Sequence, residues 1–450
     1  MSDNKDLQRR ILCITSCTFG LWVGFLLNTL NLQEHFPAVQ TFYPGNYRML
    51  ATPLGMLLGT LAAPLFLDNY KLREVVYFGA FISVLCCVVM PFAFAPEIIL
   101  VDRTFFGFSM GLLLTKYCVF VSYAVPNQNV LGYTSFLVSG FAGGCALASL
   151  VAFIAYDEDI FSRNFRIPYF VGLVLCLGWT VWVSMFLPEG PWSFVKAGND
   201  DAALRILAAF HGKPMNHEDI QLRLKQVKLA DKQHGLKTPT LITPLTAKLR
   251  SKTLIAAILL FFTFASLPAT LIFYGPKLLN TNFDGKMQIT ISLVFSCVFF
   301  VFSIFNRFII YKFQRKNAML MSAAALSLLS IVLCFLTVEK SIPLAIVTLC
   351  LCSGIASIWL SISLATVMQI FDDHAKSRSI AFSLACAWFG AILVLLFNIL
   401  APSLTVFMLA AISILSLVWI KITPLPEQHH LTAYQTSRND LLKQDSTVNN

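Results

Sequence analysis

Charged side chains are scarce in this sequence. Asp, Glu, Lys and Arg together make up 12% of its 450 residues, about half of the roughly 25% that is usual in soluble domains. So few charges exclude an ordinary soluble enzyme or binding domain, which needs a charged surface. The net charge of +10 does not indicate nucleic-acid binding, because most basic residues fall in alternate loops between apolar runs, as in membrane proteins.

Patterns that carry catalysis, nucleotide binding or metal binding are also missing. The sequence has no Gly-x-Ser-x-Gly, His-Glu-x-x-His or Gly-x-x-x-x-Gly-Lys pattern. Its 12 cysteines all lie inside hydrophobic runs, where Cys behaves as a small apolar residue, and none has the loop spacing of a metal site. We therefore predict no enzyme activity, no ATP-driven pump, no cofactor, no metal and no disulfide framework.

Apolar runs of about 20 residues, the length that crosses a hydrocarbon core of about 30 Å, fill most of the chain. The first, at 11–30, is too long for the apolar part of a signal peptide and lacks a small-residue cleavage site, so we interpret it as a span. The sequence predicts an all-α membrane protein with twelve transmembrane helices in two halves of six. The predicted spans are 11–31, 48–67, 75–94, 99–121, 131–155, 167–187, 253–274, 288–311, 318–337, 343–369, 379–400 and 403–420.

The distribution of basic residues predicts the orientation of these spans. With the N-terminus in the cytoplasm, the cytoplasmic segments hold 24 Lys and Arg and the outer segments 7; without the central polar stretch the numbers are 13 and 7. Cytoplasmic loops carry the positive excess, so both termini and the central loop are predicted to be cytoplasmic. The predicted domains are a cytoplasmic N-tail (1–10), an N-terminal half (11–187), a central loop (188–252), a C-terminal half (253–420) and a cytoplasmic tail (421–450).

The central loop is predicted to contain short helices. Asn199 can cap a helix that begins with Asp200 and Asp201, whose carboxylates suit the positive end of a helix. Asn216 can cap the following stretch HEDIQLRLKQVKLADKQ. Its apolar positions follow helical periodicity only in part, which favours a helix lying on a surface. We expect these helices to dock beneath both halves.

Two six-span halves joined by a cytoplasmic loop resemble the major facilitator superfamily, whose halves are parallel repeats. The sharpest match is Pro188-Glu189-Gly190-Pro191 followed by Phe194-Val195, which resembles the PESPRWLV signature after the sixth span of the sugar porter branch and its organic-ion relatives. Further matches resemble the Gly-rich second span with its DRxGRR loop, the repeat of that loop after the eighth span, and the RxxxGxxxG pattern of the fourth. The second span and its loop match at Gly55, Gly59, Asp68 and Arg73. The repeat of that loop matches at Lys312, Arg315 and Lys316, and the fourth span at Arg103, Gly107 and Gly111.

The departures from this pattern bear on the substrate. Trp22 stands where many sugar porters have a proton-coupling Asp, and Trp192 replaces the Arg of the loop signature. Tyr123 replaces the Glu of YxSExxP, and Ser139 the sugar-binding Gln of the fifth span. Thr263 and Phe264 replace the two Gln of the seventh. The resemblance therefore implies the fold and a transport function, but not a hexose substrate.

The resemblance implies a cavity between the halves, and ten polar or aromatic residues are candidates for substrate contacts. Charges inside a bilayer are costly and mark functional hypotheses: Arg103 could bind an anionic substrate or modulate a proton site, or else pack helices at the interface. Lys116 lies close enough to the cytoplasmic end to reach water instead, and each uncharged candidate has helix–helix packing as its alternative. The candidates are Asn28, Arg103, Lys116, Ser139, Thr263, Ser266, Tyr274, Trp359, Trp388 and Asn398.

A second group of residues is predicted to gate the cytoplasmic side. The charged loop after the second span and its repeat after the eighth would brace that side when the cavity is closed there. The alternative is a solvated turn without a role. The gating candidates are Asp68, Arg73, Glu189, Lys312, Arg315 and Lys316.

We predict a secondary active or facilitative transporter of a small organic solute, either sugar- or polyol-like or an organic anion, that works by alternating access. Its partners would be the solute, the lipid bilayer and a coupling ion if transport is active; we expect a monomer that binds no nucleic acid. No span contains Asp or Glu except Asp102 at the outer edge of the fourth, which favours facilitated diffusion or anion exchange over proton coupling. The alternative is a transporter-like sensor that binds a ligand without moving it, and the membrane is a bacterial inner membrane or a eukaryotic plasma membrane.

Overall fold

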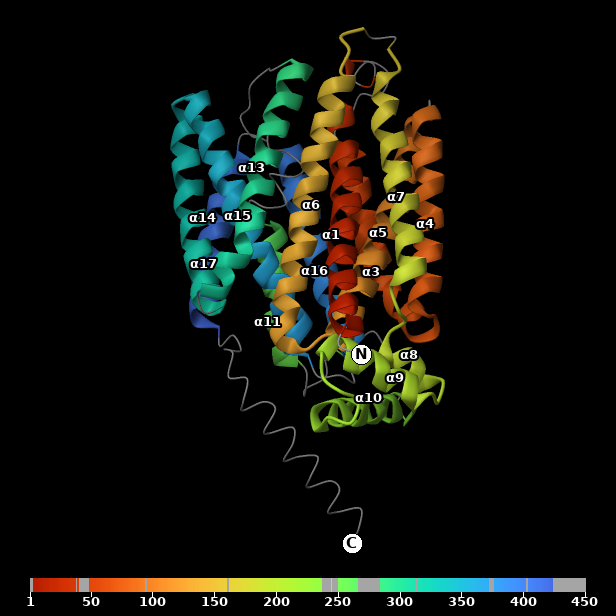
Figure 1. Cartoon of the computed structure of the whole chain (residues 1–450). Helices are drawn as coiled ribbons and strands as arrows, with labels where there is room; N and C mark the ends of the chain where they lie inside the picture. Colours follow the sequence, from red (N-terminus) through yellow and green to blue (C-terminus); the bar gives the residue numbers. More distant parts are fainter. Residues whose placement is uncertain are drawn as a thin grey trace.

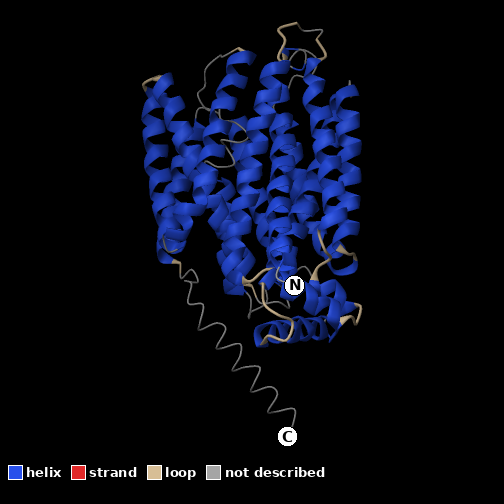
Figure 2. Cartoon of the chain, in the orientation of Figure 1, coloured by secondary structure: helices blue, strands red, loops and turns tan. Residues whose placement is uncertain are grey.

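A computed structural model of the chain describes residues 3–37, 39, 48–93, 95–159, 162–236, 244, 250–265, 284–312, 315–371, 376–401 and 404–423. Within these ranges the regular structure is helical, and most helices run side by side in one bundle (Figures 1 and 2). We call the end of the bundle at which α8–α10 lie the inner end, and the opposite end the outer end.

The helices follow the predicted spans closely. The N-terminal half contains α1 (Asp3–Leu32), η1 (Gln33–His35), α3 (Arg48–Asn69), α4 (Leu72–Val89), η2 (Met90–Phe92), α5 (Pro96–Ala124), α6 (Asn127–Ala155), η3 (Asn164–Arg166) and α7 (Ile167–Phe186). The central segment contains α8 (Pro191–Lys196), α9 (Asp200–His211) and α10 (Glu218–Leu236). The C-terminal half contains α11 (Arg250–Ala265), α13 (Gly285–Lys312), α14 (Arg315–Val338), α15 (Ile342–Ile370), α16 (Lys376–Leu400) and α17 (Thr405–Ile422).

Eleven of these helices are long and apolar enough to cross a membrane. The predicted seventh span, 253–274, corresponds to α11, which the structure describes only as far as Ala265. The remaining predicted spans each match one helix, so the predicted all-α membrane fold is confirmed.

Helices α1 and α6 pack backbone against backbone through glycines four residues apart. A Cβ atom added to Gly24 would lie 2.0 Å from the carbonyl oxygen of Phe141, and one added to Gly140 would lie 1.9 Å from that of Cys17. Gly20 and Gly144 meet the facing helix in the same way. Small residues at this spacing let helices in a membrane approach closely, so α1 and α6 lie at backbone distance from each other.

Helices α3 and α5 repeat this arrangement. A Cβ on Gly59 would lie 2.0 Å from the Phe108 oxygen, and a Cβ on Gly111 would lie 2.2 Å from the Met56 oxygen. The glycines that resemble family patterns in the second and fourth spans are therefore the two sides of one helix–helix contact.

The central helices pack beneath the N-terminal half (Figure 1). Arg9 of α1 donates to the carbonyls of Phe210 (3.2 Å) and His211 (2.7 Å) at the end of α9, and Phe210 meets the ring edge of Phe120 in α5. Gly212 ends α9 with φ of +67°, and a side chain there would collide with Arg9. The main contacts that these helices make with the bundle are to α1 and α5 of the N-terminal half. Docking beneath the C-terminal half as well stays a prediction.

The two predicted helix caps had different outcomes. Asn199 Oδ1 accepts from the Ala202 N–H at 3.1 Å, which confirms the first cap. At the start of α10 the Asp219 N–H donates to His217 Nδ1 at 3.2 Å, so His217 occupies the capping position that we predicted for Asn216.

Candidate functional site

The two halves meet along two lines of helices. In one, α3 packs on α16; in the other, α6 packs on α13 and, nearer the inner end, on α15. Ser139 Oγ of α6 donates to the carbonyl of Ser303 in α13 at 2.9 Å, and Ser149 and Ser296 hydroxyls lie 3.4 Å apart. Of the cavity candidates, Ser139 is thus the one that the described contacts place directly between the halves.

A polar cluster lies inside the C-terminal half, where α11, α15 and α16 meet. The Trp359 indole donates to Thr263 Oγ1 at 2.8 Å, and this hydroxyl lies 3.0 Å from Ser363 Oγ. Trp388 of α16 packs edge-on against Phe264, the neighbour of Thr263, with ring centroids 4.9 Å apart. We call Thr263, Trp359, Ser363 and Trp388 the C-half cluster; three of its four members were predicted from the sequence.

Trp388 differs from the other members of this cluster. Its side chain is 4% exposed, yet its indole N–H has no hydrogen-bond partner in the described part of the chain. A buried donor without a partner costs about 1–3 kcal/mol. The Trp388 indole N–H is therefore a buried donor that no described group satisfies.

The other face of α15 carries a second set of polar contacts. Ser357 Oγ donates to Asn306 Oδ1 at 3.1 Å, and Asn306 Nδ2 lies 3.5 Å from Ser361 Oγ. Sequence reasoning missed these serines, although they stand four residues apart on one helix and Asn306 is fully buried. Together the two sets hold α15 between α11 and α13.

Arg103 is not free in a cavity. Its Nη1 lies 3.0 Å from Glu34 Oε1, and its Nη2 donates to the carbonyl of Leu30 at 2.9 Å and to Gln33 Oε1 at 3.3 Å. Tyr169 of α7 also donates to Gln33. Arg103 is 1% exposed and Glu34 6%, so α5 is joined to the outer end of α1 by a buried ion pair.

Glu34 is a second acidic residue inside a span, which the sequence did not predict. The first candidate span runs Leu7–His35 and so contains this carboxylate, whereas the sequence analysis found no acidic residue inside a span other than Asp102. The apolar run ends near residue 31, and nothing in the pattern shows that the next residues continue the helix into buried surroundings.

Three other candidates take part in contacts between neighbouring helices. Asn28 Nδ2 donates to the Cys145 carbonyl at 2.8 Å and to Ser149 Oγ at 2.8 Å, within the N-terminal half. Lys116 donates to the Tyr70 carbonyl at 3.0 Å, just beyond the end of α3. Asn398 Oδ1 accepts from Thr405 at 3.0 Å, between α16 and α17. The remaining candidates, Ser266 and Tyr274, lie outside the described residues.

Trp22 lies inside the N-terminal half rather than at its surface. It is fully buried and stacks on Trp179 of α7 with ring centroids 5.0 Å apart, and Phe19 stacks on the same ring at 4.9 Å. Aromatic packing thus fills the position at which many sugar porters carry an acidic residue.

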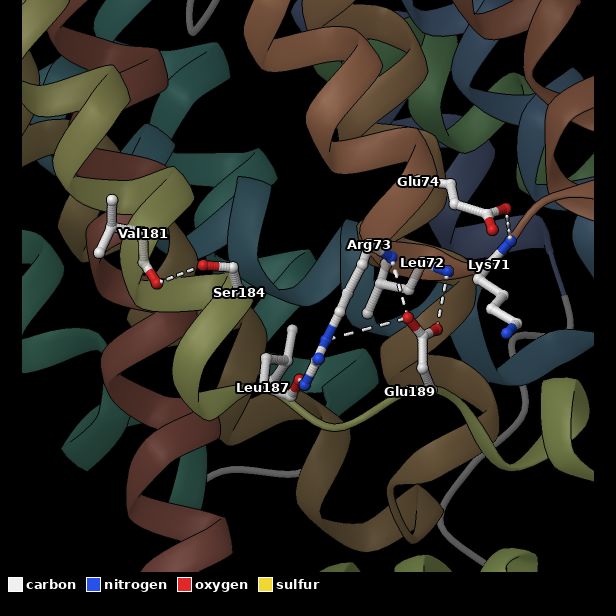
Figure 3. A network of polar contacts seen from close by, with 8 residues as sticks. All are labelled: Lys71, Leu72, Arg73, Glu74, Val181, Ser184, Leu187 and Glu189. Atoms are coloured by element: carbon white, nitrogen blue, oxygen red, sulfur yellow. Dashed lines mark hydrogen bonds and ion pairs between the residues drawn. The ribbon is translucent and has the colours of Figure 1, made fainter.

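Figure 3 shows the gating candidates Arg73 and Glu189 at the inner end. Glu189 accepts from the backbone N–H groups of Leu72 (2.9 Å) and Arg73 (3.2 Å), which places a carboxylate at the positive end of α4. The Arg73 guanidinium donates to the Leu187 carbonyl at 3.1 Å and lies 4.0 Å from Glu189. These contacts join the central segment to α4 within one half; the side chain of Asp68 lies outside the described residues.

The contacts that cross between the halves at the inner end are made by Gln369 and Lys376, which were not candidates, with the gating candidate Arg315 bonded to Gln369. Gln369 of α15 donates to the Asn127 carbonyl of α6 and accepts from Arg315. Lys376 of α16 is 4% exposed and donates to the Ser122 carbonyl at the end of α5 at 3.3 Å.

Lys376 also lies 5.2 Å above the Tyr123 ring, which packs on Trp192 of α8 at 5.6 Å. Sequence analysis counted Lys376 only as a topology charge, because its partners are backbone and aromatic groups that leave no pattern. No crossing contact is described for Lys316, and the Lys312 side chain lies outside the described residues.

The sequence profile of the family described as sugar (and other) transporters matches residues 13–438. The chain belongs to this family. A probable metabolite transport protein, CsbC of Bacillus subtilis (strain 168), is 24% identical over 255 residues, which are 54% of this chain and 52% of CsbC. Human solute carrier family 2, facilitated glucose transporter member 12, is 23% identical over 220 residues, 48% of this chain and 35% of that protein. The matched segments thus span about half and about a third of these relatives.

Solved structures share the fold over most of the chain. The proton:xylose symporter XylE bound to 6-bromo-6-deoxy-D-glucose superposes with a TM-score of 0.78 at 12% identity, covering 93% of this chain and 96% of XylE. A partially occluded inward-open form of XylE from E. coli gives 0.75 at 13% identity, with coverage of 94% and 98%. The human organic anion transporter MFSD10 gives 0.59 at 13% identity, with coverage of 92% and 99%. The family and fold are those of transporters rather than enzymes, and the protein is an integral, multi-pass membrane protein.

Proposed function

We propose that the protein transports a small neutral solute rich in hydroxyl groups, sugar- or polyol-like, by alternating access between its two halves. The observation that carries the proposal is the C-half cluster. It combines hydroxyl groups, an indole already held in place and one free indole N–H in a buried setting, the kind of donors and acceptors that pair with hydroxyl groups. The relatives named for glucose and xylose support the same substrate class.

An organic anion is the weaker candidate, because the two cations predicted to bind it are engaged elsewhere. Arg103 would have to leave Glu34, and breaking a buried ion pair costs about 3–5 kcal/mol. Lys116 donates to a backbone carbonyl beyond α3. Facilitated diffusion remains our first proposal for energetics, and the buried carboxylate of Glu34 makes proton coupling the second.

We assign inner-end gating to the crossing contacts of Lys376 and Gln369, with Arg315 supporting Gln369. These contacts have to break before the halves can separate at the inner end. Arg73 and Glu189 act indirectly by fixing the start of α4 to the central segment. The protein would work as a monomer, because each half supplies one side of the path.

Counterflow in proteoliposomes tests the substrate class. Vesicles preloaded with unlabelled xylose or glucose should accelerate uptake of the labelled sugar, whereas preloaded succinate should not. Trans-stimulation by carboxylates alone would overturn the neutral-solute proposal. Binding of a sugar without any trans-stimulation would instead support the sensor alternative, which the transporter family and fold do not favour.

Trp388→Phe tests the cluster itself. It removes the free N–H and keeps an aromatic ring, so transport should fall about three- to tenfold, the value of one hydrogen bond. Trp179→Phe is the matched control, because Trp179 is also buried with an unpartnered N–H but lies in the aromatic stack of the N-terminal half. Equal losses in both variants would remove the cluster from the substrate path.

A further inference from the structure

At the outer end, the two halves approach each other through backbone. Gly285 is the first residue of α13, in the C-terminal half, and it faces η1 of the N-terminal half. A Cβ atom on Gly285 would lie 2.1 Å from the His35 carbonyl oxygen and 2.9 Å from Tyr156 Oη. The glycines that join α1 to α6 and α3 to α5 meet backbone within one half, whereas Gly285 meets it across the two halves. We call Gly285, His35 and Tyr156 the outer contact.

The N-terminal side of the outer contact is firmly held. Gln33, Glu34 and His35 are 3–6% exposed, and Arg103 ties this turn to α5 through Glu34, Gln33 and the preceding helix end. Tyr156, at the end of α6, packs against Phe36 with ring centroids 5.7 Å apart. The His35 carbonyl is therefore a fixed point of the N-terminal half.

The C-terminal side is held by its own helix. Asp284 Oδ1 accepts from the Met287 N–H at 3.1 Å, which caps the first turn of α13. From there α13 runs along α6 past Ser149 and Ser139. A movement of α13 relative to α6 therefore carries Gly285 toward or away from His35 as one body.

We propose that Gly285 is the closure point of the outer end: the halves close there because residue 285 has no side chain, and Arg103 is a positioning residue that holds η1 for this contact. The inference rests on the proposed alternating access. With Ala at 285 the backbones must separate by about 1 Å to reach the normal carbon–oxygen contact of roughly 3.3 Å. Packed interfaces switch between discrete arrangements rather than deform smoothly, so the open arrangement becomes favoured.

The test measures amide hydrogen exchange of purified protein in lipid nanodiscs, without any substrate. In Gly285→Ala, peptides covering 33–37 and 285–292 should exchange about tenfold faster than in the wild type. Alanine raises helix propensity, so weakening of α13 cannot explain the change. Gly178→Ala is the matched control, because a Cβ there meets nothing within 4 Å. Unchanged exchange in Gly285→Ala would overturn the closure point.

Arg103→Lys provides a second variant that keeps the positive charge beside Glu34. Lysine lacks the planar fork that reaches Glu34, Gln33 and the Leu30 carbonyl together, so exchange at 33–37 should rise. If both residues act on one contact, the double variant Gly285→Ala with Arg103→Lys should increase hydrogen exchange no more than the single variant with the larger increase. Additive effects would overturn the positioning role of Arg103.

Counterflow of the same variants separates this inference from the proposed function. Faster exchange in Gly285→Ala with no sugar counterflow in the wild type would refute the transport proposal and leave the outer contact standing. Sugar counterflow that is equal in the wild type and Gly285→Ala, together with unchanged exchange, would refute the outer contact alone.

Discussion

The two halves share a helical layout but are held together by different chemistry. In the N-terminal half, glycines bring α1 onto α6 and α3 onto α5 at backbone distance, which leaves no space for a ligand between those helices. In the C-terminal half, hydroxyl, amide and indole groups join α15 to α11 and α13. The difference teaches that close backbone contact fixes the helix pairs of the N-terminal half, while polar side chains make the contacts of α15 in the C-terminal half.

Buried charge is divided in the same way. Among the described residues, Glu34, Asp102, Arg103 and Lys116 are buried in the N-terminal half. In the C-terminal half the corresponding residue is Lys376, which reaches back to α5 of the other half. The Arg103–Glu34 pair, Lys116 and Lys376 thus join helices or halves, and the C-half cluster is formed by neutral groups. This division suits a neutral substrate.

Arg103→Met should lower the stability of the N-terminal half and have the largest effect of these substitutions. It leaves Glu34 buried without its cation, which costs about 3–5 kcal/mol. Thermal unfolding in detergent should occur at a clearly lower temperature. Replacing both partners, Arg103→Met with Glu34→Leu, removes the unpaired charge and should recover most of the loss. A double variant as unstable as the single one would show that Arg103 stabilises the fold through other contacts.

Gly24→Val tests the close contact between α1 and α6. It should lower the free energy of unfolding by about 1–3 kcal/mol, somewhat less than Arg103→Met, as expected of an overpacked interior. The added side chain would collide with the Phe141 carbonyl, which lies 2.0 Å from the Cβ position. Gly178→Val, where the Cβ position is open, should unfold at nearly the wild-type temperature. Equal losses in the two variants would mean that the bulk of valine, not close helix approach, is responsible.

The fold was predictable because apolar runs and loop charge report directly on spans and orientation. Which residues contact one another could not be predicted in the same way. The glycines of α3 and α5 stand out in the sequence, but only the structure shows that they face each other. Glu34 lies three residues beyond the apolar run, and its burial depends on Arg103 about 70 positions later.

The candidate site shows the same limit. Thr263 and Trp359 were found because they stand at family positions, and Trp388 because it is an aromatic side chain in the eleventh span. Asn28 and Asn398 have the same polar character but serve helix packing, and single residues carry no sign of which role applies. Lys376 has the charge of an ordinary loop lysine, and its contact from α16 to the end of α5 follows from how the two halves meet.

Glu189→Gln should have the smallest effect on stability. It tests whether the central segment supports only the N-terminal half. The carboxylate bonds two N–H groups at the start of α4, and glutamine retains one acceptor but loses the charge at the helix end, worth about 0.3–1 kcal/mol. Because Glu189 precedes α8, the loss should loosen the junction of the central helices with α4 and leave the C-half cluster unchanged. Hydrogen exchange should therefore rise at 71–75 and 187–196 but not at 357–363. A rise at 357–363 would mean that the central segment also supports the C-terminal half, against the contacts that α8–α10 make with α1 and α5.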